Sequence, residues 1–222
     1  MSTHGSIHRI SESLDATYGV PARDPLPLGN HTDPLDELIY IQLTVMTEFG
    51  VDGVWRDMKR RYPTWDRVLR ARRATLVRIL QPIGLYEQRA DRLRAILKRI
   101  KEDRGECTLD FLAEMPDAEA ESYLTSLPGV GKKVARCVLM YSLGRDVLPV
   151  DAHVLRVAKR LHLLDEELSW SRAHEAIHEA IPPPYRYSLH VNLVRHGRSV
   201  CRARNPRCEE CGLLHQLCDG TS

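Results

Sequence analysis

Apolar residues recur at helical spacing along most of the chain. The clearest stretch is 88–101, where Leu93, Ile96, Leu97 and Ile100 form one apolar stripe with arginines opposite. The same periodicity predicts helices over residues 11–18, 34–45, 51–62, 64–71, 74–81, 108–115, 118–126, 171–180 and 185–197, and another after residue 151. No run alternates apolar and polar residues with a period of two, so the pattern predicts an all-α fold.

The loops divide these helices into two groups. Residues 20–32 carry three prolines and a glycine, which predicts a crossing loop. The helices within 34–148 are joined by short loops and suit one compact bundle. The N-terminal segment and the chain from Asp151 onward would form a second lobe, an arrangement that composition alone does not show.

A glycine-rich turn lies near the middle of the chain. The sequence Leu127-Pro128-Gly129-Val130-Gly131 leads directly into an apolar helix that opens with Lys132 and Lys133. Glycine lacks a Cβ, so the backbone can take positive φ and approach a ligand closely. The free N–H groups at a helix start attract anions. We therefore interpret this stretch as a phosphate-binding turn, which holds a nucleic-acid strand without reading its sequence.

Charge is distributed unevenly. The whole 222-residue chain has a net charge of only +2, but residues 180–208 contain six arginines and no acidic residue. Such a one-sided basic stretch is typical of phosphate binding, although a solvated charged surface would look the same. The N-terminus lacks the apolar core of a signal peptide, and no segment is long and apolar enough to span a membrane. We therefore expect a cytoplasmic protein.

Four cysteines near the C-terminus have metal-ligand spacing. Cys201, Cys208, Cys211 and Cys218 are separated by six, two and six residues. Spacing alone suits Zn²⁺ and a [4Fe–4S] cluster equally. The remaining two, Cys107 and Cys137, are expected to be ordinary core thiols.

Taken together, these motifs resemble those of the endonuclease III-like DNA glycosylases of the helix-hairpin-helix-Gly/Pro-Asp superfamily. The hairpin reads LPGVG with lysine in the second position after it, a break follows at Gly144, and the motif closes with Val150-Asp151-Ala152-His153. The resemblance extends over about residues 34–218. It implies a two-lobe fold with a six-helix bundle at 34–148, and a discontinuous second lobe of 1–33 plus 149–222 carrying an iron-sulfur cluster at 201–218.

The resemblance also assigns chemistry to two residues. Lys133 would be the nucleophile, because an amine can attack the sugar C1′ of a damaged nucleoside and leave an imine. Asp151 would stabilise positive charge on the sugar and accept a proton. From the residues alone, Lys132 and Lys133 could both be phosphate contacts, and Asp151 could be an ordinary helix N-cap. Spacing does not choose between the lysines; the resemblance favours Lys133.

In the resembled family the four cysteines bind a [4Fe–4S] cluster, with spacings of six, two and five. The last spacing is one residue longer here, so zinc stays open as the alternative. We interpret the metal centre as structural. Its first loop would present Arg202, Arg204 and Arg207 to phosphate.

Two loops are expected to fill the space left by a flipped nucleotide. One is Gly84-Leu85-Tyr86, in which Leu85 would insert into the duplex; an ordinary core leucine is the alternative. In the other, Met46 stands where the family has an inserting glutamine. Methionine can fill space but cannot hydrogen-bond the orphaned base.

The sequence thus predicts a base excision repair glycosylase with AP lyase activity. It would remove oxidised pyrimidines from duplex DNA through a lysine Schiff base and cleave the strand by β-elimination. The alternatives are a glycosylase for another lesion such as 8-oxoguanine, or a weakly active helix-hairpin-helix DNA-binding protein. We expect a nucleoid-associated monomer whose partner is duplex DNA with a damaged base or abasic site. Leu127, Gly129, Val130, Gly131 and Lys132 are the expected hairpin contacts.

Overall fold

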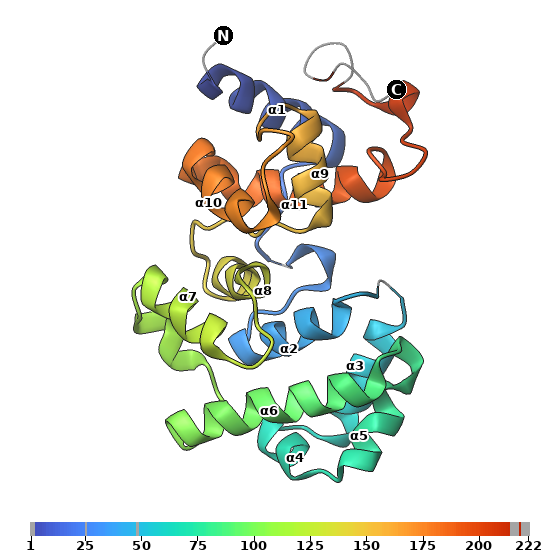
Figure 1. Ribbon diagram of the computed structural model, residues 1–222, viewed down its shortest axis with the longest axis vertical. Helices are drawn as coiled ribbons and strands as arrows, with labels where there is room; N and C mark the ends of the chain where they lie inside the picture. Colours follow the sequence, from blue (N-terminus) through green and yellow to red (C-terminus); the bar gives the residue numbers. More distant parts are fainter. Residues whose placement is uncertain (1–2, 25, 48, 214–217, 219–222) are drawn as a thin grey trace. The chain divides into compact units, whose positions relative to one another are not determined.

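The structure is a computed structural model that describes residues 3–24, 26–47, 49–213 and 218. These residues form α-helices, short 3₁₀ turns and one π-helical turn, without any β-strand (Figure 1). The predicted all-α class is therefore confirmed. None of the described helices is long and apolar enough to cross a membrane.

The chain divides into two compact units, residues 30–144 and residues 1–29 with 145–222. The boundaries differ from the predicted 34 and 148. At the first, Asp33 caps the first helix of the 30–144 unit, and the ring of His31 stacks on Trp55 at 4.6 Å. At the second, Leu148 is fully buried in the core of the other unit.

Among its described residues, the 30–144 unit contains seven α-helices: α2 (Pro34–Thr44), α3 (Val51–Arg61), α4 (Trp65–Arg70), α5 (Arg73–Leu80), α6 (Tyr86–Arg104), α7 (Asp117–Ser126) and α8 (Lys132–Cys137). Three shorter elements accompany them: η2 (Gln81–Ile83), η3 (Asp110–Glu114) and the π-turn η4 (Val138–Ser142), which continues α8. The long helix α6 packs against α4 and α5, and α2 packs against α8 and η4. This packing fixes the start of α8 on the unit's core.

Local chemistry explains where the first helix of this unit begins. The side chain of Asp33 accepts a hydrogen bond from the N–H of Asp36 at 2.7 Å, and Pro34 occupies the first helical position. An N-cap carboxylate followed by proline is a strong start signal. Helix α6 ends at Gly105, whose φ of +82° suits a glycine C-cap.

The other unit contains α1 (Thr3–Tyr18), η1 (Pro27–Gly29), α9 (Ala152–Arg160), α10 (Trp170–Ala180), α11 (Pro183–Ser199) and η5 (Cys208–Glu210). Helix α11 packs against both α1 and α9. The approach to α9 is close at Gly197, where a Cβ would lie 2.8 Å from the Cβ of His153. Glycine is required there for packing.

The helix boundary that differs most from the prediction is the start of α1. Helix α1 begins at Thr3, so Ser11, the first residue of the predicted helix and its expected cap, is instead buried inside the helix. The reason is tertiary: Ile7, Ile10 and Leu14 are all at most 1% exposed and extend the apolar stripe toward the N-terminus. Burial of that stripe stabilises the extra turns.

Candidate functional site

The hairpin between α7 and α8 has a defined backbone. The side chains of Leu127 and Val130 are buried, and the N–H of Val130 donates to the carbonyl of Leu127 at 3.1 Å. Gly129 has φ of +72°, whereas Gly131 has φ of −98° and ψ of 172°. Of these two glycines, only Gly129 has the left-handed backbone conformation that favours glycine. Leu127 and Val130 shape the turn from within.

The outer side of the turn offers backbone donors. Within the described parts of the chain, the N–H groups of Gly129 and Gly131 donate to no other atom. Gly131 is the N-cap of α8 and has no side chain to cap it. A Cβ on Gly131 would meet nothing within 4 Å, so an anion can approach its backbone closely. Donors of this kind at a helix start suit a phosphate group.

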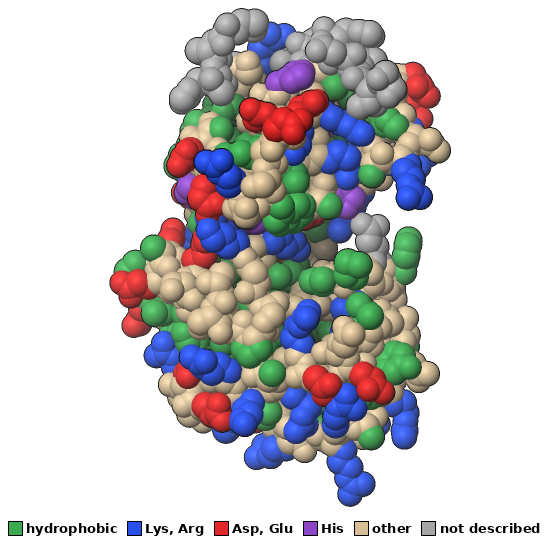
Figure 2. All heavy atoms as spheres, viewed as in Figure 1, with side chains coloured by type: hydrophobic (Ala, Val, Ile, Leu, Met, Phe, Trp, Pro, Cys, Tyr) green, Lys and Arg blue, Asp and Glu red, His purple; other side chains and the backbone are tan. Residues whose placement is uncertain are grey.

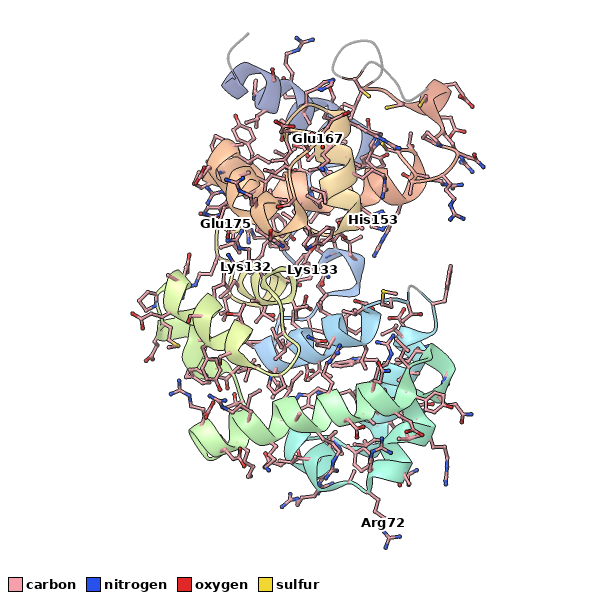
Figure 3. The ribbon with its side chains drawn as sticks, in the orientation of Figure 1. Arg72, Lys132, Lys133, His153, Glu167 and Glu175 are labelled. Atoms are coloured by element: carbon pink, nitrogen blue, oxygen red, sulfur yellow. The ribbon has the colours of Figure 1, made fainter. Side chains whose placement is uncertain are left out.

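The two lysines after the turn have different surroundings. Lys132 is exposed and Lys133 is half-buried, and both are labelled at the start of α8 in Figure 3. The helix itself is held by Arg136, only 7% exposed, whose Nε donates to Glu121 on α7 at 2.8 Å. Lys133 is thus the partly desolvated lysine of the pair, on an anchored helix.

A buried carboxyl group on α2 interacts with this lysine. Glu37 is 0% exposed, and its Oε2 accepts a hydrogen bond from the N–H of His31 at 2.8 Å, while Oε1 has no partner among the described residues. Burial raises the pKa of Glu37 to about 8, against the opposing effects of the His31 N–H and the charge of Lys133. The sequence does not single out Glu37, because an Asp-Glu pair in the first turn of a helix is ordinary.

Asp151 lies at the start of α9. Its Oδ1 accepts a hydrogen bond from the N–H of Val154 at 2.8 Å, which confirms that it is an N-cap. The carboxylate is half-buried. The capping hydrogen bond engages one carboxylate oxygen and holds the carboxylate in a single orientation.

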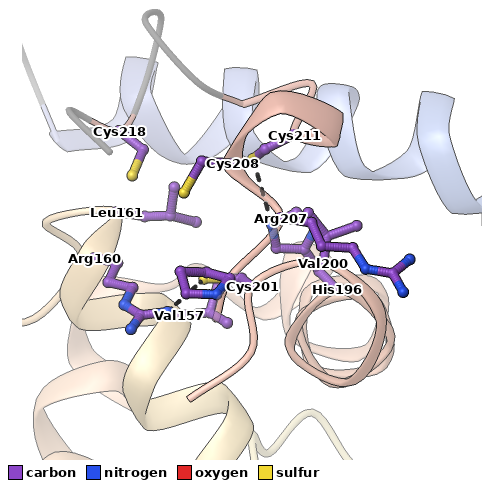
Figure 4. A pocket seen from close by; sticks show the side chains of 11 residues that line it. Val157, Arg160, Leu161, His196, Val200, Cys201, Arg207, Cys208, Cys211 and Cys218 are labelled. Atoms are coloured by element: carbon purple, nitrogen blue, oxygen red, sulfur yellow. Dashed lines mark hydrogen bonds between the residues drawn. The ribbon is translucent and has the colours of Figure 1, made fainter. Parts of the chain in front are cut away.

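The four predicted metal ligands line one pocket. Cys201, Cys208, Cys211 and Cys218 all face it, together with apolar side chains such as Leu161 (Figure 4). No disulfide joins the six cysteines, all of which lie in the described part of the chain. Among those same residues, no three histidine, cysteine or acidic side chains meet closely enough to hold a single metal ion.

Donors surround two of the thiols. Arg160 Nη1 lies 3.2 Å from the Sγ of Cys201, and His196 Nε2 lies 3.7 Å from the Sγ of Cys211. Hydrogen bonds to sulfur stabilise thiolates that ligate a metal. The donor set, four thiols around one apolar pocket with a guanidinium beside Cys201, has the chemistry of a thiolate-bound metal centre, but the described side chains would have to move closer together to hold it.

The arginines of the first cysteine loop are all exposed. Arg202 donates to the carbonyl of Ser199 at 3.1 Å, and Arg207 pairs with Glu210 at 3.4 Å. Because Glu210 partly neutralises Arg207, we expect Arg202 and Arg204 to be the stronger phosphate contacts.

The two expected insertion residues project from their loops. Met46 is 87% exposed and Leu85 is 51% exposed. The alternative that Leu85 is a core residue is therefore wrong. Apolar side chains are visible at the surface of this unit (Figure 2).

Comparison with known proteins places this hairpin in a family. Residues 44–183 match the family model described as the HhH-GPD superfamily base excision DNA repair protein. An endonuclease III of Bacillus subtilis is 31% identical over 189 residues, which cover 85% of this chain and 82% of that protein. The chain belongs to the HhH-GPD superfamily. It is a DNA glycosylase of base excision repair.

Other matches agree. An Arabidopsis thaliana protein named as a candidate DNA glycosylase is 30% identical over 168 residues; the match covers 75% of this chain and 57% of that protein. The chain thus spans little more than half the length of this relative. Two solved endonuclease III–DNA complexes, one non-covalent and one a trapped covalent intermediate, superpose with TM-scores of 0.81 and 0.80 at 25% identity. Both superpositions cover 98% of this chain, and 95% and 96% of the solved chains.

Proposed function

We propose that this protein is a bifunctional glycosylase and AP lyase that removes oxidised pyrimidines from duplex DNA. The observation that carries the proposal is Lys133, a half-buried amine two residues beyond Gly131, the N-cap of α8 in the glycine-rich hairpin. The trapped covalent intermediate of a related endonuclease III supports a covalent route.

The proposed reaction breaks the bond between the sugar and the base first and the C3′–O bond second. The neutral amine of Lys133 attacks C1′, the C1′–N bond to the base breaks, and the base leaves after protonation. Loss of the amine proton and ring opening give a Schiff base between Nζ and C1′. A base then removes a proton from C2′, and the C3′–O bond breaks by β-elimination, releasing the 3′ phosphate.

Asp151 has a separate proposed role. Its carboxylate would stabilise the positive charge that develops on the sugar as the base departs, and accept a proton from the nucleophile. The second oxygen of a capping carboxylate can serve this purpose while the first remains bonded to Val154.

We further propose that the four cysteines bind a [4Fe–4S] cluster that stabilises the loop at 201–218. When bound, the cluster supplies structural cross-linking and not chemistry on the sugar. The alternative is a zinc ion.

The deciding experiment is borohydride trapping on duplexes containing thymine glycol, 8-oxoguanine or an abasic site. We expect wild type and Lys132→Ala to form a covalent adduct and Lys133→Ala to form none, while Lys133→Ala still binds DNA. Preferential trapping on 8-oxoguanine would support the second candidate lesion. Loss of the adduct in Lys132→Ala but not in Lys133→Ala would reverse the assignment, and no adduct with any duplex would favour a DNA-binding protein without lyase chemistry.

A further inference from the structure

Two exposed apolar residues of the 30–144 unit have strained backbones. Met46 has φ of 63° and Leu85 has φ of 47°, although neither is glycine. Left-handed backbone is unfavourable for residues with a Cβ, and exposed apolar surface gains nothing in the free protein. Strain of this kind persists only where surrounding contacts enforce it, and it is concentrated at functional sites.

A single buried side chain enforces both conformations. Arg89, on α6, is 8% exposed; its Nη2 donates to the carbonyl of Val45 at 2.8 Å and its Nε to the carbonyl of Gly84 at 2.9 Å. These carbonyls belong to the residues directly before Met46 and Leu85. Arg89 therefore holds the two loops by equivalent positions.

The same guanidinium also donates hydrogen bonds to helix α2. Its Nη1 donates to the carbonyls of Leu43 at 3.0 Å and Gln42 at 3.2 Å. No carboxylate contacts Arg89 among the described residues. Burial lowers the pKa of Arg89, with a further contribution from Arg92. A buried arginine satisfied by carbonyls alone is a costly arrangement, which indicates that its geometry matters.

The side chain of Gln42 extends this contact to the hairpin. Its Nε2 donates to the carbonyl of Gly129 at 2.9 Å. The hydrogen-bonded path thus runs from the hairpin turn through Gln42 and Arg89 to both exposed loops. All of these groups lie within the 30–144 unit, so the path does not depend on any other part of the chain.

A third apolar side chain lies on the same loop as Met46. Phe49 is 83% exposed, and its carbonyl accepts a hydrogen bond from Thr47 Oγ1 at 3.2 Å. An exposed aromatic ring beside a nucleic-acid contact suits stacking on a base, which tolerates any base because each has a π-face. Methionine at position 46 has no amide that could hydrogen-bond a base, so stacking is the contact that these side chains can offer.

Insertion by Met46 and Leu85 is what the family resemblance implies. We propose that Arg89 and Gln42 are positioning residues that fix these two loops relative to the hairpin. In this proposal the ring of Phe49 joins Met46 and Leu85 in one insertion surface, because it can stack on an unpaired nucleobase. The inference rests on the proposed function, since insertion matters only for an enzyme that flips a nucleotide. It predicts little discrimination among the bases opposite the lesion.

The positioning role is tested with Arg89→Met and a matched control, Arg94→Met. Arg94 is also on α6 and also donates to loop carbonyls, those of Leu69 at 3.2 Å and Ala71 at 2.6 Å, but to a different loop. The readout is fluorescence of 2-aminopurine placed beside a stable abasic analogue in a duplex, which rises when insertion unstacks it. We expect Arg89→Met to lose the rise and Arg94→Met to keep it.

Borohydride trapping separates this inference from the lysine chemistry. A single-stranded abasic oligonucleotide needs no insertion, so Arg89→Met should trap it normally while trapping on the duplex falls by about 100-fold. Wild-type fluorescence and duplex trapping in Arg89→Met would overturn the positioning role. No trapping of the single strand by wild type would instead contradict the proposed function, and the fluorescence measurement would still decide insertion.

Leu85→Gly and Met46→Gly test the insertion surface independently if Arg89→Met does not fold. Both replace a strained, exposed residue with one that prefers positive φ, so the fold is retained while the inserted side chain is lost. We expect both to lose the fluorescence rise; a normal rise in both would refute the insertion surface.

Stacking is tested at Phe49 by affinity for the abasic duplex with each base placed opposite in turn. Phe49→Ala should weaken binding by about 10-fold for all four bases, and Phe49→Tyr should restore it. Unchanged affinity in Phe49→Ala, or a loss confined to one opposite base, would rule out stacking by this ring.

Discussion

The carboxyl group of Glu37 on α2 and the amine of Lys133 on α8 interact electrostatically, although Glu37 is fully buried and its Oε1 has no partner in the described part of the protein. Burial favours the neutral acid, since an ionised carboxylate would lose its hydration.

This relationship predicts how stability depends on pH. The pKa of Glu37 is raised from 4.5 to about 8 on folding. Its contribution to stability is therefore fully present below about pH 4.5 and is lost as the pH rises toward about 8, because the folded state binds the extra proton in that range. Relative to Glu37→Gln, the unfolding free energy of wild type should fall by about 1 kcal/mol per pH unit between about pH 5 and 7.5. Urea denaturation at several pH values measures this.

The control for Glu37 is Glu102→Gln, which changes an exposed glutamate paired with Lys98. It should show the same pH dependence as wild type. A flat difference between wild type and Glu37→Gln would mean that Glu37 is ionised in the folded protein.

The hairpin glycines should respond differently to alanine. Gly129→Ala places a Cβ at φ of +72° and 2.6 Å from Arg92 Nε, so it should destabilise the fold by about 1–2 kcal/mol. Gly131→Ala has neither problem, yet its Cβ would obstruct a phosphate. We expect Gly131→Ala to keep the wild-type melting temperature and lose DNA affinity, measured by thermal denaturation and fluorescence anisotropy. Wild-type affinity in Gly131→Ala would exclude close phosphate approach at this position.

Asp151→Asn separates the cap from the proposed catalyst. Asparagine caps a helix about as well as aspartate, so the melting temperature should be unchanged while single-turnover base release falls by about 10²–10⁴-fold. Asp33→Asn, at the N-cap of α2, is the control and should keep full activity. Full activity in Asp151→Asn would leave Asp151 as a cap only.

The metal prediction concerns the purified protein under reducing conditions. We expect about four irons per chain and broad absorption near about 400 nm, as a [4Fe–4S] centre requires. Cys208→Ser should lose iron, whereas Cys107→Ser should keep it, because the Cys107 thiol lies outside the pocket and contacts the carbonyl of Leu97 at 3.7 Å. One zinc per chain would establish the alternative.

The cysteine loop should contribute to the salt dependence of DNA binding. Replacing Arg202 and Arg204 by alanine should flatten the slope of log K against log salt by about two charges. Arg207→Ala should change it less, since Glu210 pairs with that guanidinium. An unaltered slope in the double variant would place these arginines away from DNA.

Features with a local cause could be read from the sequence. The 3.6-residue period predicted the helical class, and short motifs predicted the hairpin turn and the Asp151 cap, because periodicity and capping act within one or two turns of chain. The family followed from the same motifs. Local signals failed at α1, where the burial of Ile7 and Ile10 extends the helix beyond its apparent start.

Only the tertiary structure decided which of two similar neighbours is buried. Lys133 is half-buried and Lys132 exposed. Glu37 is 0% exposed, whereas Asp36 pairs with Lys59 at 2.7 Å. Arg89 looks like any charge on an amphipathic helix until the carbonyls of two distant loops surround it. Burial and partners depend on residues far apart in the chain, so desolvation, and with it the chemistry of each side chain, is settled by packing.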